Sequence, residues 1–256
     1  MIDSSHPSDS NLVGITLPVQ TQTMLDKALA YVAVLAFPQL FFANRFDYKN
    51  YEIWSDKPID PRINKVLDDA TRRLRTSELY DPDRKIRVYF CKAPWRLWLY
   101  SQHFTDKLGG ATDTWLTRNV YIRASDIGSN RIDSPGPGPI LDPDQRPLSY
   151  YIAHEATHVI ESREFGRLMV LRYPQWLTEG YADYVGKGGD FDFDENLRLL
   201  LADSFLLDYE RSGLYRRYEL EVLYLINRRG LTVRQIFADP PRELDLLKLL
   251  RNSSQL

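Results

Sequence analysis

The sequence is poor in cysteine. Its 256 residues include only Cys91, which cannot form an intramolecular disulfide or a thiolate-rich metal site. Any bound metal would therefore depend on imidazole and carboxylate ligands. Histidine is scarce too, with four residues in the chain, so two histidines at metal-binding spacing are informative.

Net charge is nearly absent as well. Thirty-three Lys and Arg residues balance 35 Asp and Glu residues, which leaves a formal charge of −2 at pH 7. A chain with so little net charge has no overall field that attracts a phosphate backbone, so we expect no nucleic-acid partner. The 43% hydrophobic and 27% charged residues fit a globular chain and exclude fibrous or low-complexity architectures.

The sequence also lacks an apolar run as long as most membrane-spanning helices need, about 20 residues. The closest approach is residues 28–43 (ALAYVAVLAFPQLFFA), in which Gln39 is the only clearly polar residue. Two interpretations stay open: a membrane anchor or interfacial helix, and a helix packed on the domain. Pro38 would kink either one. The first interpretation predicts a membrane-associated protein, and the second is compatible with a cytoplasmic one.

The remaining sequence separates into a tail, this apolar segment and one larger domain. Residues 1–24 are polar, lack a periodic pattern and are expected to form a flexible N-terminal tail. Residues 25–46 contain the apolar helix that is the candidate membrane anchor. Residues 47–256 are expected to form a single domain.

Within the larger domain, strand patterns come first and helical patterns follow. Alternating aromatic and β-branched residues predict three strands, and helical periodicity predicts a helix that starts near Pro61. Gly109 and Gly110 should break the chain before the third strand. The strands are expected at 50–56, 85–91 and 118–124, an irregular Pro-rich loop at 134–147, and later helices at 149–164, 176–185, 195–210, 215–228, 233–237 and 242–250. This order predicts the α+β class.

Residues 154–158 read His-Glu-Ala-Thr-His. On a helix, His154 and His158 lie one turn apart on nearly the same side, so both imidazoles can bind one cation. Glu155 then lies near the metal without binding it, where a general base can deprotonate metal-bound water. The expected metal is one Zn²⁺ ion, whose tetrahedral preference is met by two imidazoles, one further protein ligand and one open position for water.

Two placements compete for the third ligand. Metzincin-like spacing points to Glu161 and Glu164, but nothing breaks the helix at Glu161, so Glu164 would lie about 9 Å beyond His158. We therefore expect both glutamates to be solvated surface charges. The second placement is the segment WLTEGYADY, where Glu179 can complete the coordination. Asp183, one turn later, is placed to accept the spare N–H of a ligating imidazole.

The segment HEATH, followed after twenty residues by EGYAD, resembles the gluzincin metallopeptidases. The closest likeness is to the compact peptidase-MA-like group, whose second helix reads WL-x-EG-x-A-x-Y. The resemblance implies a zincin-like fold, with a small mixed sheet and flanking helices, then a mainly helical half, and zinc in the cleft. It also implies that His154, His158 and Glu179 bind zinc, that Glu155 is the base and proton shuttle, and that Asp183 supports His154.

The same resemblance suggests how the substrate is held. In this family an edge strand, matched here to 118–124, pairs with the extended substrate backbone. The aminopeptidase-like gluzincins stabilise the oxyanion with a tyrosine fifteen residues before a helix-ending glycine, and Tyr215 stands fifteen residues before Gly230. Competing tyrosines are Tyr218, one turn later, and Tyr173. Packing roles are favoured for Tyr218 and Tyr224, and a surface or half-buried position for His103.

These residues predict a zinc-dependent peptidase, a hydrolase that cleaves peptide bonds through a zinc-bound water activated by Glu155. The zinc aminopeptidases carry a Gly-x-Met-Glu-Asn segment that binds the substrate's free amine, and this chain has no Met-Glu pair. Endopeptidase action on a peptide or protein substrate is therefore expected. The alternative is a catalytically silent zincin-fold scaffold or binding protein, with or without membrane association.

Overall fold

The computed structural model describes residues 19–105, 108–133 and 146–253. Most of the predicted tail (1–24) and most of the predicted Pro-rich loop (134–147) lie outside the described residues. The chain divides between Phe37 and Pro38 into two units.

The described part of the N-terminal unit is formed mainly by the helix α1 (Val19–Ala36). It begins inside the segment 1–24 that was expected to be a tail, and it ends before residue 46, the end of the segment expected to contain the apolar helix. The early end has a local cause, because the residue before a proline disfavours the helical conformation and Pro38 follows closely. Among the described helices, none has both the length and the apolar character that crossing a membrane would require.

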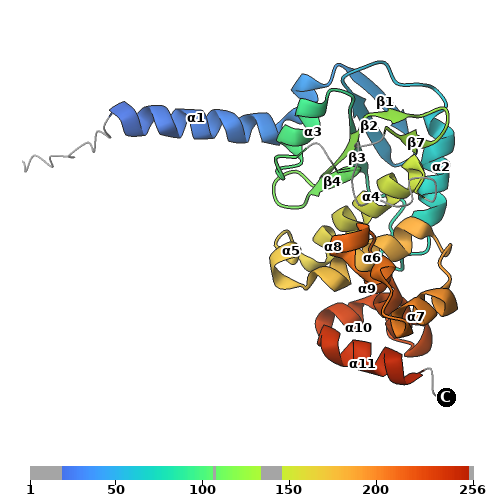
Figure 1. The fold of residues 1–256 in the computed structure, drawn as a ribbon. Coiled ribbons are helices and arrows are strands. Elements are labelled where there is room, and N and C mark those ends of the chain that lie inside the picture. Colours follow the sequence, from blue (N-terminus) through green and yellow to red (C-terminus); the bar gives the residue numbers. More distant parts are fainter. Residues whose placement is uncertain (1–18, 106–107, 134–145, 254–256) are drawn as a thin grey trace, which may run out of the picture. The chain divides into compact units, whose positions relative to one another are not determined.

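The second unit begins with a short 3₁₀ helix, η1 (Pro38–Phe41), and a five-stranded sheet in the order β1-β2-β3-β5-β4 (Figure 1). β2 and β5 are parallel to the central β3, whereas β1 and β4 are antiparallel edge strands, so the sheet is mixed. The strands are β1 (Asn44–Tyr48), β2 (Tyr51–Ser55), β3 (Ile86–Cys91), β4 (Gly110–Asp113) and β5 (Asn119–Arg123). The predicted strands correspond to β2, β3 and β5, and the α+β class is confirmed.

The predicted edge strand was wrong. The predicted segment 118–124 contains β5, which lies between β3 and β4, and among the described strands β4 is the edge strand on this side. The error arose at Gly110, which was read as a chain break but is the first residue of β4. A four-residue strand that starts with glycine carries almost no strand pattern in the sequence.

Helices cover the two faces of the sheet differently. On one face, Val88 and Val120 belong to the main core together with α2 (Ile63–Leu74) and α4 (Leu148–Phe165). On the other face, Tyr89 and Tyr121 contact Phe42 and the end of α3 (Pro94–Tyr100), so α3 and α2 lie on opposite sides of the sheet (Figure 1). A two-stranded sheet, β6 (Ser125–Asp126) and β7 (Arg131–Ile132), follows β5.

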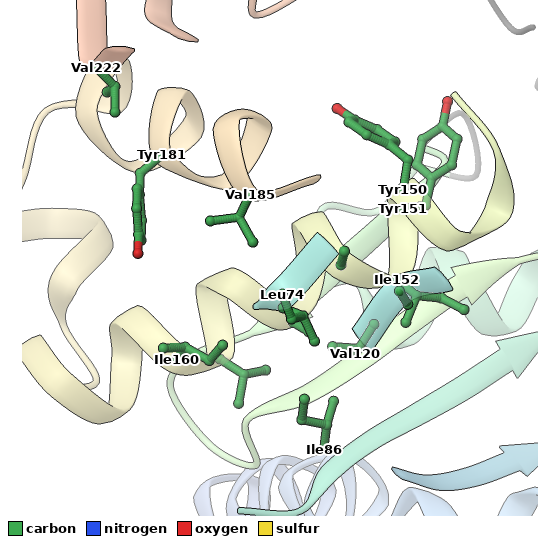
Figure 2. Close-up of a cluster of buried hydrophobic side chains, with 14 of the residues drawn as sticks. Leu74, Ile86, Val120, Tyr150, Tyr151, Ile152, Ile160, Tyr181, Val185 and Val222 are labelled. Atoms are coloured by element: carbon green, nitrogen blue, oxygen red, sulfur yellow. The ribbon is translucent and has the colours of Figure 1, made fainter. Parts of the chain in front are cut away.

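α4 is buried on every side. All residues from Leu148 to Ser162 are buried, which is the pattern of a helix enclosed by other elements rather than of a surface helix. Figure 2 shows Ile152 and Ile160 of α4 toward Val120 of the sheet, with α6 on the opposite side of α4. Polar side chains on such a helix need partners inside the protein.

The C-terminal half is helical, as predicted, except for one break. The single helix predicted at 195–210 is instead α7, a 3₁₀ turn and α8, because Asp203 adopts a positive φ and Ser204 and Asp208 cap the next two turns. The elements are α5 (Met169–Arg172), α6 (Gln175–Lys187), α7 (Phe193–Leu201), η2 (Phe205–Leu207), α8 (Tyr209–Ser212), α9 (Arg216–Leu223), the π-helical turn η3 (Tyr224–Arg228), α10 (Val233–Ala238) and α11 (Glu243–Ser253).

Candidate metal centre

The side chains of α4 and α6 converge at one point between these two packed helices. His154 and His158 come from α4 and Glu179 from α6, and one ligand atom of each lies within 4.8 Å of the others. Glu179 Oε2 lies 3.3 Å from His154 Nε2 and 3.6 Å from His158 Nε2. Among the described residues, this is the group that could hold a metal ion.

The second nitrogen of each imidazole contacts a buried carboxylate. His154 Nδ1 lies 3.5 Å from Asp183 Oδ1, and His158 Nδ1 lies 2.8 Å from Glu161 Oε2. Both acids are 0% exposed. Contacts at Nδ1 fix each ring and direct its Nε2 toward Glu179, which is the arrangement that metal-binding histidines require.

The expectation that Glu161 is a solvated charge was therefore wrong. Glu161 lies three residues after His158 on α4, so its carboxylate falls beside the same ring. Because α4 is enclosed on all sides, this position is buried rather than at the surface. Glu164 agrees better with the expectation, since it lies at the surface and pairs with Arg234 at 2.6 Å.

Asp183 is itself held by two side chains, and a third supports one of them; the sequence did not point out any of the three. The Tyr150 hydroxyl donates a hydrogen bond to Asp183 Oδ1, and Lys187 Nζ lies 3.0 Å from Asp183 Oδ2. Lys187 also pairs with buried Glu219 of α9. Tyr150 precedes His154 by one turn and Lys187 follows Asp183 by one turn, a spacing that could have suggested both. Nothing in the sequence indicates Glu219, which is brought here by the packing of α9 on α6.

Charge in this cluster is compensated locally. Burial alone would lower the pKa of His154, but Asp183 and Glu179 outweigh it and raise that pKa to about 9. Burial would raise the pKa of Glu179, but the two imidazoles hold it well below its usual range. A metal binds the deprotonated ring nitrogen. With a divalent cation in the site, the cation would therefore replace the imidazolium charges in balancing the Glu179 carboxylate.

Glu155 points to the other side, toward the sheet. The Thr112 hydroxyl on β4 lies 2.7 Å from Glu155 Oε2 and 2.8 Å from the Glu155 carbonyl oxygen. Gly110 lies so close that a β-carbon there would be 2.8 Å from Glu155 Cγ. The first residues of β4 therefore fix the position of the candidate base, and the glycine is required by this close approach.

The outer edge of β4 carries backbone groups not used in the sheet. Gly109 accepts a hydrogen bond from the Arg123 amide of β5 at 3.1 Å, and hydrogen-bonded residues alternate along an antiparallel pair. Ala111 and Asp113 therefore face β5. The backbone N–H and C=O groups of Gly110 and Thr112 therefore point away from β5.

Tyr215, at the start of α9, lies over His154. The two rings are parallel within 10°, with centroids 5.8 Å apart. Burial, and then the nearby Glu179 carboxylate, raise the pKa of Tyr215 well above its usual value, so its hydroxyl stays protonated. Tyr218 stacks on Tyr215 at 5.9 Å.

The other candidates lie elsewhere. Tyr173 packs against Phe165 and Phe237 in an aromatic cluster, and Tyr224 is buried in the main core. His103 is exposed and stands outside the group of His154, His158 and Glu179.

The donor set fits a small divalent cation. Two imidazole nitrogens and one carboxylate oxygen, supported by two buried acids, form a group that could hold a metal ion. The family models, curated proteins and solved structures compared with the chain contain no match for it.

Proposed function

We propose that the protein is a zinc-dependent peptidase of the gluzincin type. The observation that carries the proposal is the convergence of His154, His158 and Glu179, each imidazole backed by its own buried acid. Glu155, the residue next to His154 in the sequence, is the acid to which we assign the hydrolytic role, and its carboxylate is hydrogen-bonded to Thr112 of the edge strand β4. An α+β arrangement, with a mixed sheet before a helical half, is compatible with a zincin fold.

In this proposal His154, His158 and Glu179 hold one zinc ion. Bound zinc supplies Lewis-acid chemistry, which polarises a carbonyl group and acidifies water. Asp183 and Glu161 keep the imidazoles in the tautomer that leaves Nε2 free. Tyr150 and Lys187 keep Asp183 in place and ionised, since Lys187 holds the Asp183 pKa well below its usual value despite burial.

Glu155 moves the proton. Its carboxylate accepts a proton from the attacking water and delivers it to the nitrogen of the leaving amine. Thr112 fixes one carboxylate oxygen by its hydrogen bond to Oε2. The other oxygen remains available for the water.

Tyr215 is the proposed oxyanion donor. Its position over His154 brings it close to the metal ligands, and its raised pKa keeps the phenol in the form that donates a hydrogen bond. Such a donor contributes most when negative charge develops on the carbonyl oxygen.

The edge of β4, instead of β5, is the proposed docking strand for substrate. An extended peptide can pair with the outward N–H and C=O groups of Gly110 and Thr112, which would place its backbone beside Glu155. Pairing through the backbone suits an endopeptidase, because it does not require a free amine or carboxylate at the end of the substrate.

Metal analysis combined with hydrolysis of a mixed peptide library tests the proposal. We expect about one zinc per chain, cleavage that a chelator abolishes and zinc restores, and a loss of at least about a hundredfold in Glu155→Gln with zinc retained. Glu164→Gln, a surface position on the same helix, is the matched control and should cleave normally.

Two results would reject the peptidase. Stoichiometric zinc without cleavage of any library peptide favours the alternative of a silent scaffold or binding protein. Full activity in Glu155→Gln removes the proposed mechanism.

A further inference from the structure

Two side chains of α2 connect the helices that carry the candidate metal ligands. Asp69 and Arg73 lie one turn apart on α2 and form an ion pair, with Arg73 Nε 2.9 Å from Asp69 Oδ2. α2 packs on both α4 and α6. Neither residue belongs to the group of ligands, yet Arg73 is only 7% exposed, and a buried guanidinium group needs several partners.

Arg73 binds the C-terminal end of α6. Its Nη1 donates hydrogen bonds to the carbonyl oxygens of Gly186 at 2.8 Å and Lys187 at 3.1 Å. The last carbonyl groups of a helix have no partner within the helix, and the helix dipole favours a cation beside them. Gly188, which ends α6 in a left-handed conformation, lies against the same side chain, because a β-carbon there would be 3.0 Å from Arg73 Cγ. Arg73 therefore fixes the end of α6 from a neighbouring helix.

Gly186 is also a point where α6 comes close to α4. A β-carbon at Gly186 would lie 3.0 Å from a ring carbon of Tyr150 and 3.2 Å from the β-carbon of His154. These distances are tighter than ordinary van der Waals contact, so glycine allows the close approach. The carbonyl group that Arg73 binds thus belongs to the residue at which α6 meets the ligand His154.

Asp69 extends the connection to the start of α4. Its Oδ2 accepts a hydrogen bond from the Ser149 hydroxyl at 2.5 Å as well as the one from Arg73 Nε. Ser149 lies in the first turn of α4 and is 0% exposed. A continuous set of hydrogen bonds therefore runs from α4 through one carboxylate and one guanidinium group to the end of α6. We call Ser149, Asp69 and Arg73 the α2 clamp.

We propose that Arg73 is a positioning residue of the metal centre. Through the α2 clamp it sets the separation of α4 and α6, and with it the distance from the two imidazoles of α4 to Glu179 of α6. Zinc binds nitrogen and oxygen ligands at about 2.0–2.2 Å, so a small shift of α6 weakens coordination. This role rests on the proposed metal centre, and it adds a residue that touches none of the three ligands.

Metal binding by Arg73→Met tests this role. The substitution keeps much of the aliphatic volume and removes every hydrogen bond of the guanidinium group. We expect zinc affinity, measured against a chromophoric chelator, to fall by at least about tenfold. We also expect altered visible absorption bands in the protein loaded with Co²⁺, since these bands report ligand geometry.

Arg72→Met is the matched control. Arg72 is the neighbouring arginine and pairs with the same Asp69 carboxylate at 2.5 Å, but its side chain is 58% exposed. Its side-chain hydrogen bonds within the described residues all go to Asp69 rather than to α6. Zinc affinity and the Co²⁺ bands should therefore equal those of wild type.

Two further variants separate positioning from stability. Leu246→Ala removes a fully buried side chain on α11 and should lower Tm without changing zinc affinity or the Co²⁺ bands. Arg73→Lys keeps the charge, but an ammonium group lacks the fork that binds the carboxylate and the carbonyl groups together. It should recover only part of the affinity. Binding is measured well below the lowest Tm of the set, so that every variant compared is folded.

Three outcomes would overturn the proposal. Wild-type zinc affinity and Co²⁺ bands in Arg73→Met, with a lower Tm, would show that Arg73 only stabilises the fold. If Arg73→Met does not fold, the same result in Arg73→Lys leads to the same conclusion. An equal loss of affinity in Leu246→Ala would assign the effect to stability. Wild-type protein that binds neither Zn²⁺ nor Co²⁺ is a different failure, because it rejects the metal centre itself and this role with it.

Discussion

His154 and His158 are each fixed by a carboxylate that the protein has removed from solvent. The convergence of the two imidazoles could be predicted from the sequence, and so could the position of Asp183 beside His154, because their spacing follows directly from helix geometry. The role of Glu161 could not be predicted. Its spacing was visible, but whether it faces solvent or the core depends on how many elements surround α4.

The carboxylates behind the imidazoles are expected to control metal affinity. Asp183→Asn and Glu161→Gln each remove a charge behind a ligating ring, and we expect zinc affinity to fall about 10- to 100-fold in each. Competition with a chromophoric chelator measures the affinity. Glu164→Gln serves as the control on the same helix. Unchanged affinity in both buried variants would show that these acids do not support a metal.

Glu221 on α9 is expected to reduce the stability of the fold at neutral pH. It is 0% exposed, its oxygens have no hydrogen-bond partner among the described residues, and Arg217 lies 3.6 Å away. Burial, and then Glu243, raise its pKa well above the usual value. The folded state therefore binds this proton more tightly than the unfolded state, so stability falls as pH rises from the unfolded pKa toward the folded one.

Glu221→Gln should remove that pH-dependent loss. Each unit of raised pKa corresponds to about 1.4 kcal/mol, so the variant should be more stable than wild type at neutral pH. The difference should shrink as the pH falls toward about 4, where the wild-type side chain is protonated in both states. Urea unfolding across this pH range measures the difference, with exposed Glu210→Gln as the control. A variant that is less stable at neutral pH would contradict the expectation.

At the scale of elements, the short strand β4 connects the sheet to the candidate base. In Gly110→Ala, the new methyl group would lie 2.8 Å from Glu155 Cγ and 3.0 Å from Ile122 Cδ1. We expect Glu155 to shift and hydrolysis to fall about a hundredfold, because small displacements of a catalytic group are costly. Zinc content should stay the same, since no ligand is touched. A parallel loss of zinc would instead indicate general disruption.

Sequence patterns predict best the elements that are long enough to show helical periodicity or that contain a recognisable motif. α2, α4 and α6 fall where periodicity and the two metal motifs indicate them. Sequence patterns do not predict the edge strands β1 and β4. Their four or five residues include Asn, Asp or Gly, and they gain stability only by pairing with β2 and β5. The break after α7 depends on the positive φ of Asp203, which periodicity cannot reveal.

At the scale of the whole molecule, the candidate ligands join two halves of the domain. α4 packs on the sheet and α6 packs on α9 of the helical half, so one ion would connect them. Zinc at a hundredfold excess over its Kd should stabilise the fold by about 2.7 kcal/mol, which corresponds to roughly 5–10 °C in Tm. Calorimetry with and without a chelator measures the shift. Glu179→Ala should not respond to zinc, and an equal response in both proteins would place the ion elsewhere.

All residues of α4 from Leu148 to Ser162 are buried, between the sheet on one side and α6 on the other. The two histidines of this helix therefore cannot move without repacking both neighbours. A substitution in either layer would be transmitted to the imidazoles even where it touches neither ring.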